Sequence, residues 1–170
     1  VPAPRHARAR VLPREPGWPG QPLPLRDLPS APPAMPLSAS DLQAAIPRIF
    51  APWIVAMDFE VLEVGPGGRV SLRLPVKRDY VHVGGVMCGQ AAMAAADTAM
   101  VLAMMAELGE FRPMTTVQLN TSFLRPVSAD HCRVEARVLR SGKNLAFGSI
   151  DLLNPDGRLA VQASTTYALL

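Results

Sequence analysis

Apolar residues run almost unbroken from Gln90 to Leu108, and this run dominates the pattern of the chain. Ala, Met, Leu and Val fill nearly every position, so a helix formed here is apolar all round, which is typical of a helix enclosed by other elements. One carboxylate, Asp97, lies in the middle, where an unpaired ion is costly to desolvate. The run from 91 to 106 is shorter than the roughly 20 residues needed to span a bilayer. We therefore expect a buried helix and no membrane association.

Alternating apolar and polar residues on both sides of this helix predict strands. Before the helix, a short amphipathic helix is expected over 41–50, and Pro52 ends it. The strands are expected at 58–64 and 70–76, joined by a GPGG turn at 65–68, and then at 115–126, 131–142, 144–153 and 159–170. Residues 141–143 and the NPDG sequence at 154–157 predict the turns between the last three strands.

The alternation in residues 115–126 predicts one apolar face and one polar row. The apolar face carries Val117, Leu119 and Phe123, and the polar row carries Thr116, Gln118, Asn120 and Ser122. A helix that is apolar all round must be covered on several sides, and a curved sheet does this. We therefore predict an α+β fold, with one strongly curved antiparallel sheet of five to six strands wrapped around one long central helix.

Proline divides the chain into two parts. Eleven of the eighteen prolines lie between Val1 and Pro36, where neither a helix nor a central strand could persist. We predict a Pro-rich N-terminal tail over 1–37 and one folded domain over 38–170. The length of 170 residues and the 49% hydrophobic content suit a single core.

The charged and sulfur-containing residues narrow the function and the compartment. The net charge is +3, but six arginines lie in the first 48 residues, and no basic stripe is interleaved with aromatic residues. This argues against a nucleic-acid partner. No zinc-ligand spacing is present, so we expect no metal. Cys88 and Cys132 are the only cysteines, and no export signal precedes the folded part, so we expect a cytoplasmic protein without a disulfide.

Asp97 is the strongest candidate for chemistry. Its neighbours three and four residues away on the helix cannot neutralise it; they are Met93, Ala94, Met100 and Val101. One interpretation is a structural carboxylate that accepts hydrogen bonds from a strand hydroxyl or a backbone amide. The other is a nucleophile or general base at the mouth of a pocket.

The start of the helix is the second candidate. Gly84, Gly85 and Gly89 precede or open it, and the free amides near Gly89 suit a carbonyl oxygen that becomes negative. A Gly-rich loop that only needs positive φ is the alternative. Eight residues separate Gly89 from Asp97, which is about 12 Å along a helix axis, so one carbonyl group cannot touch both. If both serve one reaction, they come from two chains of a homodimer with antiparallel helices.

Three segments resemble the hotdog-fold acyl-CoA thioesterases of the PaaI-like, phenylacetate-pathway type. They are GVMCGQAAMAAADTAM, TTVQLNTSFLRPV and RVEARVLRSGKNLAFGSIDLLNPDGRLAVQASTTY, and the resemblance covers roughly Ile46 to Leu170. It implies a hotdog fold and hydrolysis of an acyl-CoA to a free acid and CoA. It implies no cofactor, because CoA is part of the substrate. It also implies a homodimer, and we expect two dimers to associate.

The resemblance also implies roles for individual residues. Asp97 matches the catalytic carboxylate, Gly89 the oxyanion amide, and Thr116 the strand hydroxyl that orients water. His82 matches a position that is often Asn in the family and is expected to hydrogen-bond the thioester or water. The residues expected near the CoA nucleotide and phosphates are Arg125, Pro126, Arg140, Ser141, Gly142 and Lys143.

Two positions depart from the family pattern. Cys88 stands where the family has His, and Gln90 stands where it has a second Gly. A helix N-terminus lowers the pKa of a thiol, which makes Cys88 an alternative nucleophile, but no base is evident beside it. Gln90 and Thr98 either contact substrate or have structural roles. Cys88, Gln90, Thr98 and Asn120 complete the set of candidate substrate-binding residues.

The sequence thus predicts an acyl-CoA thioesterase, with two alternatives. One is a non-catalytic acyl-CoA-binding hotdog protein, against which the retained Asp97 argues. The other is a hydratase-like hotdog enzyme, which would carry an Asp and a His close together on the loop and helix. Here His82 lies fifteen residues before Asp97.

Overall fold

A computed structural model describes residues 37–170 of the chain. The tail predicted for 1–37 therefore lies outside the described residues, except for Leu37. The elements are α1 (Ala39–Ile49), α2 (Pro52–Val55), β1 (Glu60–Gly65), β2 (Arg69–Pro75), the 3₁₀ turn η2 (Arg78–Tyr80), α3 (Gly89–Leu108), β3 (Met114–Phe123), β4 (His131–Ser141), β5 (Leu145–Leu153) and β6 (Leu159–Leu169). All the predicted helices and strands are present.

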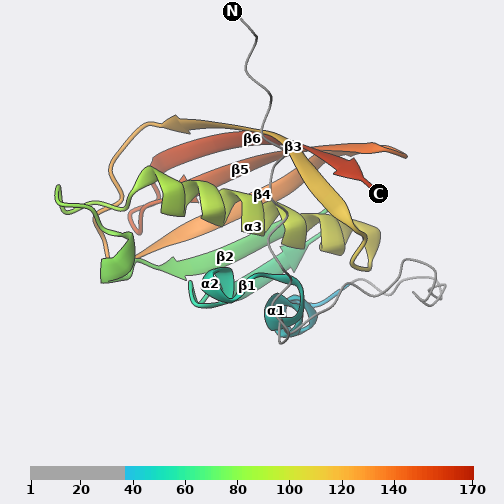
Figure 1. Cartoon of the computed structure of the whole chain (residues 1–170), viewed down its shortest axis with the longest axis horizontal. Coiled ribbons are helices and arrows are strands. Elements are labelled where there is room, and N and C mark those ends of the chain that lie inside the picture. Colours follow the sequence, from blue (N-terminus) through green and yellow to red (C-terminus); the bar gives the residue numbers. More distant parts are fainter. Residues whose placement is uncertain (1–36) are drawn as a thin grey trace, which may run out of the picture. The chain divides into compact units, whose positions relative to one another are not determined.

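Helix α1 packs against β1 at the edge of the sheet (Figure 1). A capping box begins it: the Asp41 amide donates to the Ser38 hydroxyl, and the Ser38 amide donates to the Asp41 carboxylate. Gln43 then joins the helix to the start of β1, because its side chain donates to the Phe59 carbonyl and accepts from the Val61 amide. Through the buried Leu42 and Ile46, this helix adds to the core.

The six strands form one antiparallel sheet in the order β1-β2-β4-β5-β6-β3. The sheet curves around α3, as Figure 1 shows. Strand β3 follows α3 and pairs with the last strand, β6, so β3 forms one edge of the sheet and β1 the other. The predicted α+β architecture, one helix in a curved sheet, is confirmed.

Helix α3 is the core of the domain. It ends at Gly109, which adopts φ 74° and donates to the Met105 carbonyl at 2.8 Å, as a left-handed helix cap does. Its length and composition would suit a membrane span, but 61% of its most apolar window is buried inside the domain. The helix also lies very close to β5, where a Cβ added to Gly148 would be 2.1 Å from the Met100 sulfur. The prediction of a buried core helix is confirmed.

One strand differs from its prediction, because β3 contains a bulge. Thr116 pairs with Tyr167 and Gln118 pairs with Thr166, so Val117 is an extra residue without a partner on β6. The Val117 side chain is 60% exposed. An extra residue reverses the alternation on one side of it, which a simple period of two cannot predict.

The bulge corrects the predicted faces of β3. The side toward α3 carries Thr116, Leu119 and Phe123, and the outer side carries Gln118, Asn120 and Ser122. Thr116 and Asn120 were expected in one polar row, and they lie on opposite sides. The buried Thr165 hydroxyl donates to the Gln118 carbonyl at 2.7 Å and so holds the backbone at the bulge.

Candidate active site

Two hydroxyls hold the carboxylate of Asp97. The Thr116 hydroxyl donates to Asp97 Oδ1 at 2.9 Å. The Tyr167 hydroxyl donates to the same oxygen and also lies 3.1 Å from the Asp97 backbone carbonyl oxygen. Oδ2 accepts no hydrogen bond from residues 37–170. The structure therefore brings Asp97 and Thr116 together. The Asp97 carboxylate is half-buried, and its Oδ2 is free to contact a ligand.

Tyr167 is the member of this cluster that sequence reasoning missed. Its side chain is 1% exposed on the inner face of β6. Burial first, and the negative charge of Asp97 next, raise the pKa of the Tyr167 hydroxyl far above its usual range, so it stays protonated and donates. A signal was available: a tyrosine at a buried position of a strand needs a partner for its hydroxyl.

The start of α3 offers a free amide. Gly89 is the first helical residue, and the first hydrogen bond of the helix runs from the Ala92 amide to the Cys88 carbonyl at 3.3 Å. Within the described part of the chain nothing accepts from the Gly89 N–H. The Cys88 amide is already used, because it donates to the Tyr80 carbonyl at 2.7 Å.

His82 lies in the loop before the helix, where its ring is fixed by the backbone. The Gly84 amide donates to His82 Nδ1 at 2.9 Å, and a Cβ at Gly84 would lie 2.7 Å from the ring. Since Nδ1 accepts, the neutral ring carries its proton on Nε2. His82 is exposed, so this second nitrogen is free to donate to a ligand.

A hollow of about 440 Å³ lies beside the start of α3. Gly89, Arg125 and Pro126 line it together with apolar residues that include Phe123 and Val127. Arg125 is held there by a hydrogen bond from Nη1 to the Leu159 carbonyl at 2.8 Å. Three predicted site residues therefore share one cavity.

The other predicted CoA contacts lie at the opposite end of the sheet. The turn 140–143 adjoins the C-terminal end of β6, where the Leu169 amide donates to the Asn144 carbonyl at 2.8 Å. Arg125 follows the end of β3 that pairs with Val161 at the start of β6. A strand of ten residues separates the two ends, which is about 33 Å. One chain does not bring the two groups together.

The other four candidates lie at the start of α3, on β3 and in the core. Cys88 is the half-buried N-cap of α3 and its thiol caps nothing, Gln90 is exposed, Asn120 is exposed on the outer side of β3, and Thr98 is 2% exposed in the core. Both cysteines are free thiols. Burial raises the pKa of Cys132 to about 12, so this thiol is unreactive near neutral pH.

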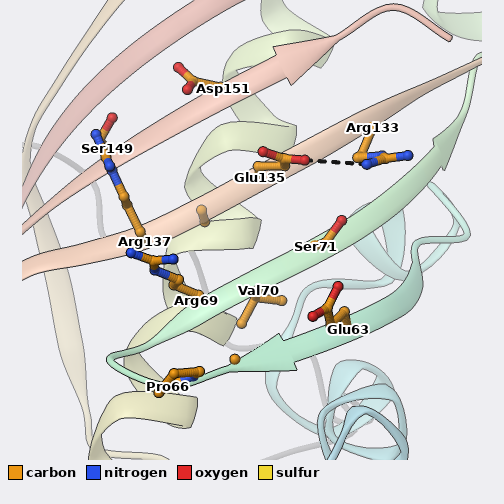
Figure 2. Close-up of a pocket in the computed structure, with 12 residues that line it drawn as sticks. Glu63, Pro66, Arg69, Val70, Ser71, Arg133, Glu135, Arg137, Ser149 and Asp151 are labelled. Carbon is orange, nitrogen blue, oxygen red and sulfur yellow. Dashed lines mark hydrogen bonds and ion pairs between the residues drawn. The ribbon is translucent and has the colours of Figure 1, made fainter. Parts of the chain in front are cut away.

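A second hollow, of about 410 Å³, lies on the outer face of β1, β2, β4 and β5. Figure 2 shows its charged side chains on the side of the strands away from α3. Three arginines and three carboxylates line it, namely Arg69, Arg133, Arg137, Glu63, Glu135 and Asp151. None of the predicted site residues lies there. Across residues 37–170, no group of three or more His, Cys, Asp or Glu side chains is arranged to hold a metal ion.

Comparison with known proteins agrees with this geometry. Residues 84–161, which include the start of α3, Asp97 and β3, match the family described as the Thioesterase superfamily. A protein of Thermoplasma acidophilum named as a putative esterase is 30% identical over 111 residues, which cover 65% of this chain and 83% of that protein. The chain belongs to the thioesterase superfamily. It is therefore a hydrolase of thioesters or esters.

Solved structures of other proteins have the same fold as this thioesterase-superfamily chain. Zebra fish thioesterase superfamily member 2 superposes with a TM-score of 0.70 at 25% identity, covering 79% of this chain and 99% of that one. The PaaI protein of the E. coli phenylacetic acid degradation operon superposes with a TM-score of 0.68 at 17% identity, covering 78% and 93%. The predicted hotdog fold of the PaaI-like type is confirmed.

Proposed function

We propose that this chain is an acyl-CoA thioesterase in which Asp97 acts on the thioester carbonyl group and the Gly89 amide polarises it. The observation that carries the proposal is the asymmetric Asp97 carboxylate. Two hydroxyls donate to Oδ1, and Oδ2 accepts nothing from the described residues. A carboxylate that is held on one side and free on the other suits attack or proton transfer.

The chemistry requires two groups acting on one carbonyl. The Gly89 N–H donates to the carbonyl oxygen, which becomes negative as the tetrahedral intermediate forms. Asp97 Oδ2 either attacks the carbonyl carbon or takes a proton from an attacking water. The carbon–sulfur bond then breaks, the CoA sulfur leaves as a thiolate and gains a proton, and the acid is released after water has supplied its oxygen. If Asp97 attacks, it forms a mixed anhydride with the acyl group, and water then hydrolyses this anhydride. If Asp97 acts as a base, the water attacks the carbonyl carbon directly.

The two groups must come from different subunits. Gly89 and Asp97 lie about 12 Å apart along α3, which exceeds the reach of one carbonyl group. One face of α3 is left partly open by the sheet, and it carries Gln90, Met93, Ala94, Asp97 and Val101 at helical spacing. Met93 is 38% exposed, which is unusual for a large apolar side chain on a core helix. A second copy of α3 would cover this face.

Strand β3 supports the same dimer. It is a ten-residue edge strand, and three large apolar side chains are exposed at its bulge and just at its end: Val117, Phe123 and Leu124. Such an edge is a template for antiparallel pairing with another copy. A two-fold axis at the middle of 114–123 aligns Thr116 with position 121 of the second copy. Because Phe123 packs under Gly89, the second Gly89 would then approach Asp97.

The dimer would also unite the predicted CoA contacts. Antiparallel β3 strands bring the turn 140–143 of one subunit to the Arg125 end of the other. Arg125, Arg140 and Lys143 would then offer three positive charges for the phosphates of CoA. The hollow beside Gly89 offers an apolar wall for the acyl group.

Subunit complementation tests the shared site. Asp97→Asn and Gly89→Pro chains, each expected to be inactive, are mixed by denaturation and refolding together. A mixed dimer contains one site with both groups intact, so a random equal mixture should recover about a quarter of the wild-type turnover. Each variant refolded alone is the control. No recovery from a mixture shown to contain mixed dimers would overturn the shared site.

A panel of acyl-CoA thioesters tests the substrate class. Release of free CoA is followed with a thiol reagent, and binding is measured in parallel by calorimetry. We expect turnover that depends on Asp97. Tight binding without release of CoA would instead favour a non-catalytic acyl-CoA-binding protein.

A further inference from the structure

Tyr167 is a buried side chain in the site, and its hydroxyl is bonded to Asp97. Its ring lies in the core at 1% exposure, and its hydroxyl contacts the Asp97 carboxylate, the Asp97 carbonyl oxygen and the Thr116 hydroxyl. We propose that Tyr167 is a positioning residue that, with Thr116, fixes Asp97 Oδ1 so that Oδ2 faces the reacting group. This inference rests on the proposed function of Asp97.

The geometry explains how two hydroxyls select one oxygen. Rotation about the Cβ–Cγ bond of an aspartate is soft and exchanges its two oxygens. Here Thr116 donates to Oδ1 from β3, and Tyr167 donates to Oδ1 from the neighbouring strand β6. The two residues are direct partners in the sheet register, so their donors converge on one point. Rotation of the carboxylate would break both hydrogen bonds.

Tyr167 also fixes the backbone beneath the carboxylate. Its hydroxyl lies 3.1 Å from the Asp97 carbonyl oxygen, so one atom of β6 is joined to both the main chain and the side chain of Asp97. This sets the height of the carboxylate on α3 relative to the sheet. A displacement of about 1 Å of a reacting group can reduce a rate by two orders of magnitude, so such a contact bears on turnover.

The donors are neutral, and this suits a reactive carboxylate. No basic side chain in the range 37–170 forms an ion pair with Asp97. Tyr167 keeps its proton because burial and the nearby Asp97 raise its pKa. Two hydroxyls therefore orient the carboxylate without the full neutralisation that an arginine would impose.

The variant Tyr167→Phe tests the proposal, because it keeps the buried ring and removes only the hydroxyl. We expect kcat to fall about tenfold with KM changed less than about twofold, since Tyr167 does not reach the substrate. Loss of a donor disfavours the charged carboxylate, so the acid limb of the pH–rate profile should move to higher pH. Tyr80→Phe is the matched control: Tyr80 is the only other tyrosine, and its hydroxyl donates to the Ala56 carbonyl at 3.2 Å.

A second measurement covers the case in which Tyr167→Phe does not fold. In the Tyr80→Phe background, 3-fluorotyrosine incorporated throughout the chain labels Tyr167 alone. The fluorinated hydroxyl is a stronger donor of nearly unchanged size, and it favours the charged carboxylate. The acid limb should then move to lower pH, opposite to the effect of Tyr167→Phe. A residue that only packs would move the limb in neither direction.

The outcomes separate this inference from the function on which it rests. Unchanged kcat and unchanged pH profiles in both Tyr167 forms, with Asp97→Asn inactive, would overturn the positioning role and leave the thioesterase proposal intact. Near-normal turnover in Asp97→Asn would overturn the proposed function itself. Opposite shifts of the acid limb, with KM preserved, would support both.

Discussion

Carboxylates on the two sides of the sheet have different surroundings. On the inner face, Asp97 meets two hydroxyls and no cation. On the outer face, the strand register aligns Glu63, Ser71, Glu135 and Asp151 in one row across β1, β2, β4 and β5. Rows of arginines lie on either side of it, Arg69 beside Arg137 and Arg73 beside Arg133.

This difference separates charges that face solvent from a charge that can react. Arg133 lies 3.5 Å from Glu135, and more than two fifths of each side chain is exposed, so water and counterions screen the pair. Asp97 is half-buried and held by neutral donors, so its charge is neither screened nor neutralised to the same extent. The hollow with more charged residues is therefore the weaker candidate for catalysis.

The largest expected effect comes from making the same change on both faces. Asp97→Asn should lower kcat by about 10²- to 10⁴-fold, because the amide can neither attack nor accept the proton. Asp151→Asn removes an outer-face carboxylate of the same size. Steady-state release of CoA measures both variants, and Asp151→Asn should stay within about twofold of the wild type.

If both variants retained turnover, or both lost it, the proposed contrast between Asp97 and the outer-face carboxylates would be wrong. Circular dichroism and the elution volume of each variant control for folding and assembly. A loss confined to Asp151→Asn would move the active site to the outer hollow, which also contains a buried Asp151 oxygen without a partner in the described chain.

The second prediction isolates the amide at the start of α3. Gly89→Pro removes the N–H but suits the first helical position, and Cys88 already has the extended conformation, φ −70° and ψ 150°, that a following proline requires. We expect kcat to fall by about 10²- to 10³-fold, as for loss of one oxyanion donor. Stopped-flow or steady-state turnover of the preferred acyl-CoA measures it.

Gly89→Ala is the matched control for this substitution. Its Cβ would also meet the Phe123 ring, at 3.1 Å from Cζ, but it keeps the N–H. Phe123 is 55% exposed in one chain, so the ring can yield. Equal losses in the two variants would attribute the effect to crowding at Phe123 and remove the amide from the mechanism.

The sequence predicted the fold well and the site in part, and β3 explains the limit. The apolar run with Asp97 inside it, and the alternating strands around it, determine a helix enclosed by a curved sheet. The bulge at Val117 is invisible to a period of two, so Thr116 was assigned to the wrong face. The family resemblance implied a role for Thr116 as the hydroxyl that orients water, and its contact with Asp97 was not predicted. Tyr167 was missed because its partner lies 70 residues away along the chain.

The third prediction concerns the support of the bulge. Thr165→Val removes the hydroxyl that donates to the Gln118 carbonyl, which leaves a backbone acceptor at the bulge without that partner. We expect a loss of about 1–2 kcal/mol in the free energy of unfolding. Turnover should fall several-fold, because Thr116 follows the bulge geometry. Denaturant unfolding and CoA release measure the two effects.

Thr166→Val makes the same change one residue away, on the outer side of β6. Thr166 pairs with Gln118 in the register, but its side chain points away from α3. We expect this variant to match the wild type in turnover. If Thr165→Val also kept full turnover while losing stability, the bulge would be a structural feature without influence on Asp97.

The smallest effect is expected from the outer row itself. Glu135→Gln removes the partner of Arg133 and one of three aligned carboxylates, so a lost attraction is offset by relief of repulsion between Glu135 and Asp151. The free energy of unfolding should change by less than about 1 kcal/mol, and the change should shrink as salt is added. Denaturant unfolding at low and high ionic strength measures it. A loss above about 2 kcal/mol that persists in salt would mean that the outer charges form a coupled network, and the contrast between the two faces would then rest on Asp97 chemistry alone.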